Sequence, residues 1–217
     1  MILAKIKQDL QAVFDRDPAA TSKLEVILTY AGFHALLAYR ITHWLKAHDI
    51  PILPRVISQL ARWVTGVEIH PSAKIGTGFF IDHGMGVVIG ETAEIGDYVT
   101  LFQGVTLGGT GKERGKRHPT LGNHVVVGAG AKILGGITIG DNVKIGANSV
   151  VLKNVAANST VIGVPARVIK TQGTRLPDAT MDQVDLPDPI SDRLIALEQE
   201  LIELRKRLEN PDERSHP

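Results

Sequence analysis

The stretch KILGGITIGDNVKIGANSVV, residues 132–151, decides the fold because its aliphatic residues return at every sixth position. Ile133, Ile139, Ile145 and Val151 keep this spacing, and a glycine follows both Ile139 and Ile145. A helix repeats every 3.6 residues and a strand every two, so neither element explains the pattern. A period of six is typical of a hexapeptide β-helix, in which each hexad forms one short strand on one side of a three-sided prism.

The same spacing extends from this stretch towards the N-terminus. It is kept by Leu121 and Val127 and, further upstream, by Ile69, Ile75, Ile81, Ile89, Ile95, Leu101 and Leu107. We predict that these side chains point into the prism and that the small residues after them fit its tight corners. Stacked coils share one core, so we expect residues 67–170 to fold together as a single prism.

Two interruptions break the six-residue spacing. The interval from Ile81 to Ile89 is eight residues and contains DHGMG, and the interval from Leu107 to Leu121 is fourteen and contains GGTGKERGKRHP. A loop rich in glycine, lysine and arginine does not fit in the prism wall and must project from it. Projecting loops on a rigid scaffold commonly carry function, so His83 and His118, one in each interruption, are the candidate functional histidines.

The flanking segments read as helices joined by a linker. Residues 1–66 carry apolar stripes at helical spacing, such as Phe33, Leu36 and Trp44, which we expect to pack in a core. Residues 171–190 are rich in proline and aspartate and should form a linker. Residues 191–210 should form an amphipathic or coiled-coil helix, because leucines recur at alternating steps of three and four: Leu194, Leu197, Leu201, Leu204 and Leu208.

Composition excludes several classes of function. The chain has 217 residues, a formal net charge of +1 and no cysteine. Near-neutral charge argues against a nucleic-acid partner, and the lack of an apolar run of about 18 residues argues against a membrane span. Without cysteine there are no disulfides and no thiolate metal sites. We therefore expect a cytoplasmic protein.

Several phrases in this chain resemble the serine acetyltransferase family over about residues 9–170. They are Arg16-Asp17-Pro18-Ala19, Ile81-Asp82-His83-Gly84, GGTGK at 108–112 with Arg117-His118-Pro119, and GVPAR at 163–167. The hexads and GVPAR are shared among many acyltransferases, whereas the other phrases together are specific to this family. The resemblance implies an all-β left-handed parallel β-helix with an N-terminal α-helical region and a C-terminal helix. It also implies transfer of acetyl from acetyl-CoA to the L-serine hydroxyl, which supplies O-acetylserine for cysteine biosynthesis, without a metal.

The resemblance also implies roles for individual residues. His83 matches the general base, a task that suits a neutral imidazole near pH 7. Glu68 stands where the best-known members have an aspartate that orients this base, so the extra methylene must be absorbed by a changed rotamer or a backbone shift.

Further matches concern the two substrates. Asp17 and Asp82 match carboxylates near the amino and hydroxyl groups of serine, and Arg117 and His118 match residues that hold its carboxylate. A guanidinium binds a carboxylate bidentately, which suits Arg117 to that role. Contacts to acetyl-CoA are implied for four residues with small side chains or in the projecting loop: Gly109, Thr110, Ala129 and Ala147.

Assembly is a further implication of the resemblance. Family members form trimers whose active sites lie in the cleft between neighbouring prisms, so we expect a homotrimer, with a hexamer as the alternative. Many members end in an isoleucine that inserts into O-acetylserine sulfhydrylase. This chain ends Arg214-Ser215-His216-Pro217, so we expect it to bind that enzyme weakly or not at all.

Three other functions are compatible with a hexapeptide prism. An acetyltransferase for a sugar or xenobiotic hydroxyl would share the fold but would not need Asp17, Asp82 and Arg117 for a zwitterion. A metal-dependent lyase resembling the γ-type carbonic anhydrases would need three histidines on zinc, and the spacing of His118 and His124 argues against it. The last alternative is a non-catalytic scaffold.

Overall fold

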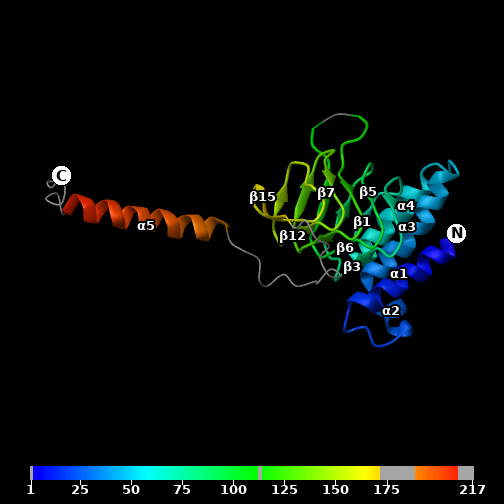
Figure 1. Ribbon diagram of the computed structural model, residues 1–217. Coiled ribbons are helices and arrows are strands. Elements are labelled where there is room, and N and C mark those ends of the chain that lie inside the picture. The colour runs from blue at the N-terminus through cyan, green and yellow to red at the C-terminus, as the bar shows by residue number, and fades with distance from the viewer. Residues whose placement is uncertain (1, 112–113, 172–188, 210–217) are drawn as a thin grey trace. The chain divides into compact units, whose positions relative to one another are not determined.

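The chain divides into two compact units, Met1–Gln183 and Val184–Pro217. The structure is a computed structural model, and it describes residues 2–111, 114–171 and 189–209. The first unit contains the N-terminal helices and the prism (Figure 1), and the second contains the C-terminal helix α5 (Pro189–Glu209). Most of the predicted linker and the chain end at Arg214–Pro217 lie outside the described residues.

Four helices precede the prism: α1 (Ile2–Arg16), α2 (Lys23–Thr29), α3 (Ala31–Ala47) and α4 (Leu53–Thr65). Ser22 caps α2 by accepting a hydrogen bond from the Glu25 amide at 3.2 Å, as the sequence S-x-x-E favours. The predicted helical region is therefore confirmed. Its apolar stripes are only partly in a core, because Leu36 of α3 is buried whereas Trp63 and Val64 of α4 are 86% and 72% exposed in the protomer.

Three parallel sheets form the sides of the prism, and each coil of the chain visits them in turn. Sheet A contains β1 (Glu68–Ile69), β4 (Val88–Ile89), β7 (Thr106–Gly108), β10 (Lys132–Leu134) and β13 (Val150–Val151). Sheet B contains β2 (Lys74–Ile75), β5 (Glu94–Ile95), β8 (Thr120–Leu121) and β11 (Thr138–Ile139). Sheet C contains β3 (Phe80–Ile81), β6 (Thr100–Leu101), β9 (Val126–Val127), β12 (Lys144–Ile145), β14 (Ser159–Gly163) and β15 (Ala166–Thr171), the last pair being antiparallel.

The six-residue spacing forms the core of this prism. In sheet A, Ile69 pairs with Ile89, Ile89 with Leu107, and Leu107 with Ile133, so one aliphatic column runs up the inside. Ile89, Leu107 and Ile133 have no exposed surface. Burying such a side chain stabilises a fold by about 1.5–3 kcal/mol, and the column continues across every coil. The predicted prism is confirmed.

Turns of successive coils stack along the edges of the prism. At the edge between sheets C and A, called edge CA, the amides of Gly86, Gly104, Gly130 and Asn148 each donate to a carbonyl of the coil below at 2.8–2.9 Å. Gly130 has a φ of +71°, and a side chain there would lie 2.2 Å from Asn148 Oδ1, so glycine is favoured at this position. The edge between sheets A and B, called edge AB, carries the long loop after β7, which projects from the prism (Figure 1).

The helices are fixed to the prism by buried polar contacts. Arg40 of α3 forms an ion pair with Asp9 of α1, with Nε and Oδ2 3.1 Å apart, and its Nη1 donates to the carbonyl of Ile75 at 2.8 Å. Tyr39 donates from its hydroxyl to the carbonyl of Ala73 at 2.7 Å. These contacts hold α1 and α3 at a defined place on the first coil, beside the first interruption of the repeat.

Helix length and hydropathy among the described residues determine whether a membrane-spanning helix is present. No single helix there is long and apolar enough to cross a bilayer, and α2 and α3 meet the length and hydropathy limits only as a pair bent by 76°.

Candidate active site

The sequence-predicted site residues fall into two clusters on different edges of one protomer. Asp82 and His83 follow β3 of sheet C and therefore lie at edge CA, next to α1 and α3. Arg117 and His118 precede β8 of sheet B and therefore lie at edge AB. Each cluster carries part of the predicted chemistry, and the wall of sheet A separates them.

The first cluster places His83 on an exposed turn beside the carboxylate of Asp82, which is itself near Asp17. His83 has a φ of +57° and a side chain that is 76% exposed, with Nε2 3.9 Å from Asp82 Oδ1. Asp17, just after α1, accepts hydrogen bonds from the Tyr30 hydroxyl at 2.7 Å and from the Ala19 amide at 2.8 Å. The imidazole is thus open on the protomer, next to a carboxylate.

A close contact between α3 and β3 positions this turn. A side-chain carbon on Gly32 would lie 2.1 Å from the carbonyl oxygen of Ile81, so only glycine allows α3 to approach the end of β3. The Gly84 amide donates to the Asp82 carbonyl at 2.6 Å and closes the turn around His83. The helical region thereby determines where the candidate base is presented.

The electrostatics of this cluster favour a cationic group. Burial is the main cause that raises the pKa of Asp82, and the nearby charge of Asp17 raises it further, against lowering by His83. The hydrogen bond to Asp17 raises the pKa of Tyr30 to about 12, so its phenol remains a donor at neutral pH. Two neighbouring carboxylates of this kind are stabilised by a bound ammonium group, because an opposite charge relieves their repulsion.

The second cluster is a network around Thr92 at edge AB. Arg117 forms an ion pair from Nη2 to Glu91, and this hydrogen bond is the main cause that lowers the pKa of Glu91. The amides of Arg117 and His118 both donate to the Thr92 hydroxyl oxygen, at 3.0 and 3.1 Å. The two predicted substrate-binding residues are therefore held by one turn of the preceding coil.

The tautomer of His118 follows from the same network. The Thr92 amide donates to His118 Nδ1 at 3.2 Å, and an amide can only donate, so Nδ1 accepts and the proton of the neutral ring is on Nε2. Burial lowers the pKa of His118, which keeps the ring neutral near pH 7. A side chain at Gly90 would lie 1.9 Å from the ring, so glycine makes room for it. His118 thus offers an N–H donor from Nε2.

Glu68 lies on β1 of sheet A, away from a direct contact with the candidate base. Its Oε2 is 3.3 Å from Arg62 Nη1 of α4, and its charge acts to raise the pKa of His70 against a larger lowering by burial. No hydrogen bond joins Glu68 to His83, both of which are in the described part of the chain. The carboxylate 3.9 Å from His83 is that of Asp82, so the orienting role of Glu68 stays a prediction.

The four residues predicted to contact acetyl-CoA also divide between the two edges. Ala129 and Ala147 follow β9 and β12, and the Ala129 carbonyl accepts from the Asn148 amide at 2.8 Å, so both lie along edge CA above His83. Gly109 and Thr110 lie at the base of the projecting loop, and a side chain on Gly109 would be 3.3 Å from His118 Nε2. Of the four residues, only Gly109 is shown close to one of the two histidines, His118.

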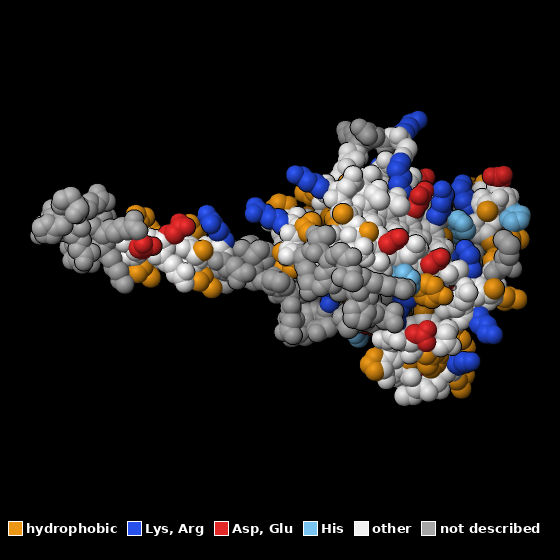
Figure 2. All heavy atoms as spheres, in the orientation of Figure 1, with side chains coloured by type: hydrophobic (Ala, Val, Ile, Leu, Met, Phe, Trp, Pro, Cys, Tyr) orange, Lys and Arg blue, Asp and Glu red, His pale blue; other side chains and the backbone are white. Residues whose placement is uncertain are grey.

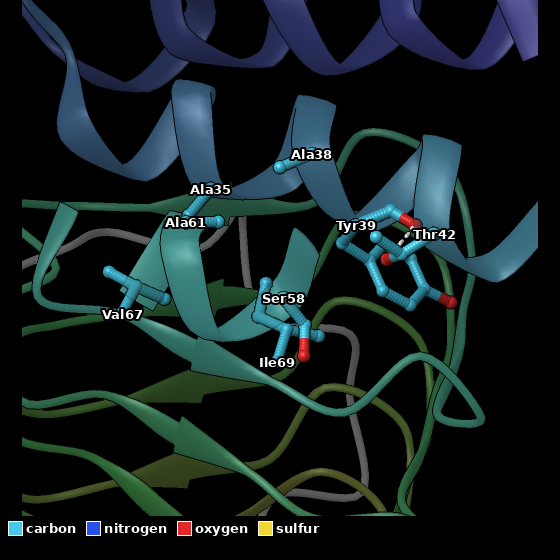
Figure 3. Close-up of a pocket in the computed structure, with 8 residues that line it drawn as sticks. All are labelled: Ala35, Ala38, Tyr39, Thr42, Ser58, Ala61, Val67 and Ile69. Atoms are coloured by element: carbon cyan, nitrogen blue, oxygen red, sulfur yellow. Dashed lines mark hydrogen bonds between the residues drawn. The ribbon is translucent and has the colours of Figure 1, made fainter. Parts of the chain in front are cut away.

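Two hollows lie close to these clusters. A cavity of about 10 Å³ between α3, α4 and β1 holds at most one water (Figure 3). A larger hollow of about 230 Å³ lies beside Glu91 at edge AB and is lined by Lys46, Ile50, Ile52, Pro54, Arg55, His70, Pro71, Ser72 and Glu91. Within the described ranges, no group of three histidine or acidic side chains is arranged to hold a metal ion.

Sequence reasoning missed three residues of these clusters. Tyr30 is placed by the packing of α2 and α3, for which the spacing carries no signal. Glu91 and Thr92 belong to the phrase Gly90-Glu91-Thr92, where an ordinary turn continues the repeat. Their role appears only when the projecting loop returns to the preceding coil.

Comparisons with known proteins agree on one family. A pattern described as "Bacterial transferase hexapeptide (six repeats)" matches residues 118–153, and one described as "Serine acetyltransferase, N-terminal" matches residues 1–38. A serine acetyltransferase of Bacillus pumilus is 56% identical over 208 residues, covering 96% of this chain and 95% of the relative. One from Synechococcus elongatus is 56% identical over 200 residues, covering 89% and 81%.

The solved structures that resemble this chain are also serine acetyltransferases. A serine acetyltransferase in complex with cysteine is 45% identical with a TM-score of 0.82, covering 85% of this chain and 72% of that chain. A Neisseria gonorrhoeae enzyme in complex with serine is 44% identical with a TM-score of 0.76, covering 78% and 69%. These likenesses support the predicted left-handed β-helix with its helical regions. Because it is 56% identical to the Bacillus pumilus enzyme over 96% of its length, the chain belongs to the serine acetyltransferase family.

Proposed function

We propose that this chain transfers the acetyl group of acetyl-CoA to the hydroxyl of L-serine, giving O-acetyl-L-serine and CoA, with His83 as the general base. The family supports the reaction, and relatives crystallised with serine or cysteine support the amino-acid substrate. The observation that carries the residue roles is the pairing of an open imidazole with two carboxylates on one edge, and of an arginine with an N–H-donating imidazole on another.

The reaction needs one proton to be moved twice. Serine's hydroxyl is too weak an acid to ionise first, so His83 takes its proton as the oxygen attacks the thioester carbonyl. The new ester bond forms and the carbon–sulfur bond breaks when the tetrahedral intermediate collapses. The imidazolium of His83 then gives the proton to the departing CoA sulfur, which restores the neutral base.

Two carboxylates, those of Asp82 and Glu68, are candidates for orienting the ring of His83. A carboxylate that accepts from the ring nitrogen away from the substrate fixes the tautomer and stabilises the imidazolium. We assign this role to Glu68 on the family pattern, which requires Glu68 to leave Arg62 and turn towards His83 when substrate is bound. The Arg62–Glu68 pair, in which Arg62 is exposed and Glu68 half-buried, opposes such a movement by about 1 kcal/mol.

Recognition of serine follows from its two charges. Its ammonium group is bound by Asp17 and Asp82; burial is the main cause that raises the pKa of Asp82, and repulsion by Asp17 adds to it. Its carboxylate is bound by the guanidinium of Arg117 and by the Nε2–H of His118, the first aligned by Glu91 and the second by Thr92. A sugar hydroxyl offers neither charge, so the same groups exclude it.

The active site must be shared between copies of the chain. The base lies at edge CA and the carboxylate-binding residues at edge AB, so one protomer does not bring them together. In a homotrimer, edge CA of one prism faces edge AB of its neighbour across a cleft, and acetyl-CoA lies in that cleft. Ala129 and Ala147 then contact it from one chain, and Gly109 and Thr110 from the next. A hexamer of two such trimers would leave this site unchanged.

Activity measurements test the reaction. Release of CoA thiol from acetyl-CoA should depend on L-serine and not on a panel of sugar and xenobiotic hydroxyls, and the metal content of the same sample should not correlate with the rate. Turnover of a sugar without turnover of serine would overturn the proposal.

Mixing two inactive variants tests the shared site. His83→Ala and Arg117→Ala proteins, each nearly inactive alone, should regain activity when unfolded together and refolded as mixed trimers. Each site needs an intact edge CA from one chain and an intact edge AB from its neighbour. In an equal mixture each of these is intact with a chance of one half, so about a quarter of the sites should be complete. His83→Ala mixed with Asp82→Ala is the matched control, since both changes are at the same edge and no site regains both. Equal rates for the two mixtures would place the whole site in one chain.

A further inference from the structure

The C-terminal helix α5 presents an apolar stripe that its own unit leaves uncovered. Leu194, Leu197, Leu201 and Leu204 are 56%, 39%, 58% and 54% exposed. They recur at steps of three, four and three, which places them on one side of a helix as the a and d positions of a heptad repeat. Figure 2 shows orange hydrophobic side chains on α5 together with red and blue charged ones.

The charges beside this stripe are arranged in a specific order. With Leu194 and Leu201 at a, Arg193 and Glu200 occupy g positions, and Glu198 and Arg205 occupy e positions. In a parallel coiled coil, each g residue faces the e residue five positions later on the neighbouring helix. The two pairs that result, Arg193 with Glu198 and Glu200 with Arg205, both join opposite charges.

These pairs cannot form within one helix. Residues that contact each other on a helix surface are three or four apart, whereas those pairs are five apart. Arg193 is followed at three and four by Ala196 and Leu197, and Glu198 by Leu201 and Ile202, so neither has an opposite charge in reach ahead of it. The pattern is complementary to a second copy of itself in parallel.

We propose that the α5 helices of the chains in one homotrimer associate in parallel as a short coiled coil, formed by residues to which the proposed active site assigns no role. The trimer itself is part of the proposed function, and its three-fold rotation makes equivalent helices point the same way along the axis, so helices that associate there do so in parallel. A helix of 21 residues is marginal in water by itself. Attachment to a common trimer supplies an effective concentration of about millimolar, which compensates for the short seam.

Cysteine cross-linking tests this contact, because the full-length chain contains no cysteine of its own. Leu197→Cys places a thiol at a d position, where equivalent residues of parallel helices face each other. Mild oxidation should link chains in pairs at least about tenfold faster than in Gln199→Cys, whose thiol is at the outward f position. Equal, slow linkage in both variants would overturn the proposal.

The charge pattern has its own test in the Leu197→Cys background. Arg193→Glu should slow the cross-linking several-fold by creating a like-charge pair, and adding Glu198→Arg should restore it. Failure of the second change to restore the rate would show that the pairs do not form.

Dilution tests whether the contact lies within one trimer. The rate of cross-linking should be unchanged on dilution. A rate that falls with dilution would mean contacts between separate assemblies and would overturn the placement within one trimer.

The result of the cross-linking experiments does not depend on the catalytic roles proposed for the site residues. None of these substitutions touches either site cluster, so serine-dependent CoA release should be unaltered in all of them. A failed cross-link with normal activity rejects the coiled coil alone, and normal cross-linking in a protein that does not acetylate serine rejects the proposed function alone.

Discussion

His83→Ala should lower turnover by about 10²–10⁴-fold, the usual contribution of a general base. The methyl group removes the proton acceptor, while Asp82 and Asp17 remain to bind the ammonium group of serine. The loss should therefore appear in kcat more than in KM, and the serine-dependent release of CoA thiol measures both. The circular dichroism spectrum should be unchanged, because the side chain is exposed and supports no packing.

Two comparisons make this result specific. His124→Ala is the matched control, since His124 is another exposed histidine with a positive φ but stacks on Tyr98, with ring centroids 5.4 Å apart. It should keep nearly full activity. Glu68→Gln should reduce turnover less than His83→Ala does. Full activity in His83→Ala would remove it as the base, and an unchanged rate in Glu68→Gln would remove Glu68 as its orienting partner.

Arg40→Leu should lower the free energy of unfolding by about 3–5 kcal/mol, the cost of leaving one member of a buried ion pair behind. Asp9 is 1% exposed, and burial already raises its pKa although Arg40 is present. Without the guanidinium, the carboxylate and the carbonyls of Ile75 and Gly76 lose a buried donor. Urea unfolding at fixed protein concentration measures the change.

An exposed ion pair is the control for this measurement. Lys74 Nζ lies 3.0 Å from Glu94 Oε1, and the two side chains are 74% and 41% exposed. Lys74→Ala should therefore lower the free energy of unfolding by no more than about 1 kcal/mol. Replacing both members of the buried pair, as Asp9→Leu with Arg40→Met, should recover part of the loss, because no charge then remains unpaired. If Arg40→Leu cost no more than Lys74→Ala, the buried pair would not be what fixes the helices to the prism.

Much of this fold could be predicted from one regular property of the sequence. A period of six is incompatible with other common architectures, and the residues that keep it, such as Ile89 and Ile133, are the buried column. The two interruptions pointed to His83 and His118 because they break this regularity. Counting hexads in threes from Ile69 would also have placed the first break at edge CA and the second at edge AB. That signal was present in the spacing.

Other features depended on packing that spacing does not encode. Tyr30 reaches Asp17 only because α2 and α3 bend back beside α1, and Thr92 holds His118 only because a long loop returns to the coil before it. Trp44 was expected to pack in a core with Phe33 and Leu36, but it is 46% exposed on the protomer. Periodicity reports which side of a helix is apolar and not whether the same chain covers it.

The division of the site between two edges has a consequence for how activity arises in time. In the proposed trimer each chain carries halves of two different sites and no complete one, so a newly made chain would be inert until it meets its neighbours. Near the concentration at which trimers dissociate, the rate per chain should then fall steeply on dilution instead of staying constant. Assembly would act as the step that switches the enzyme on.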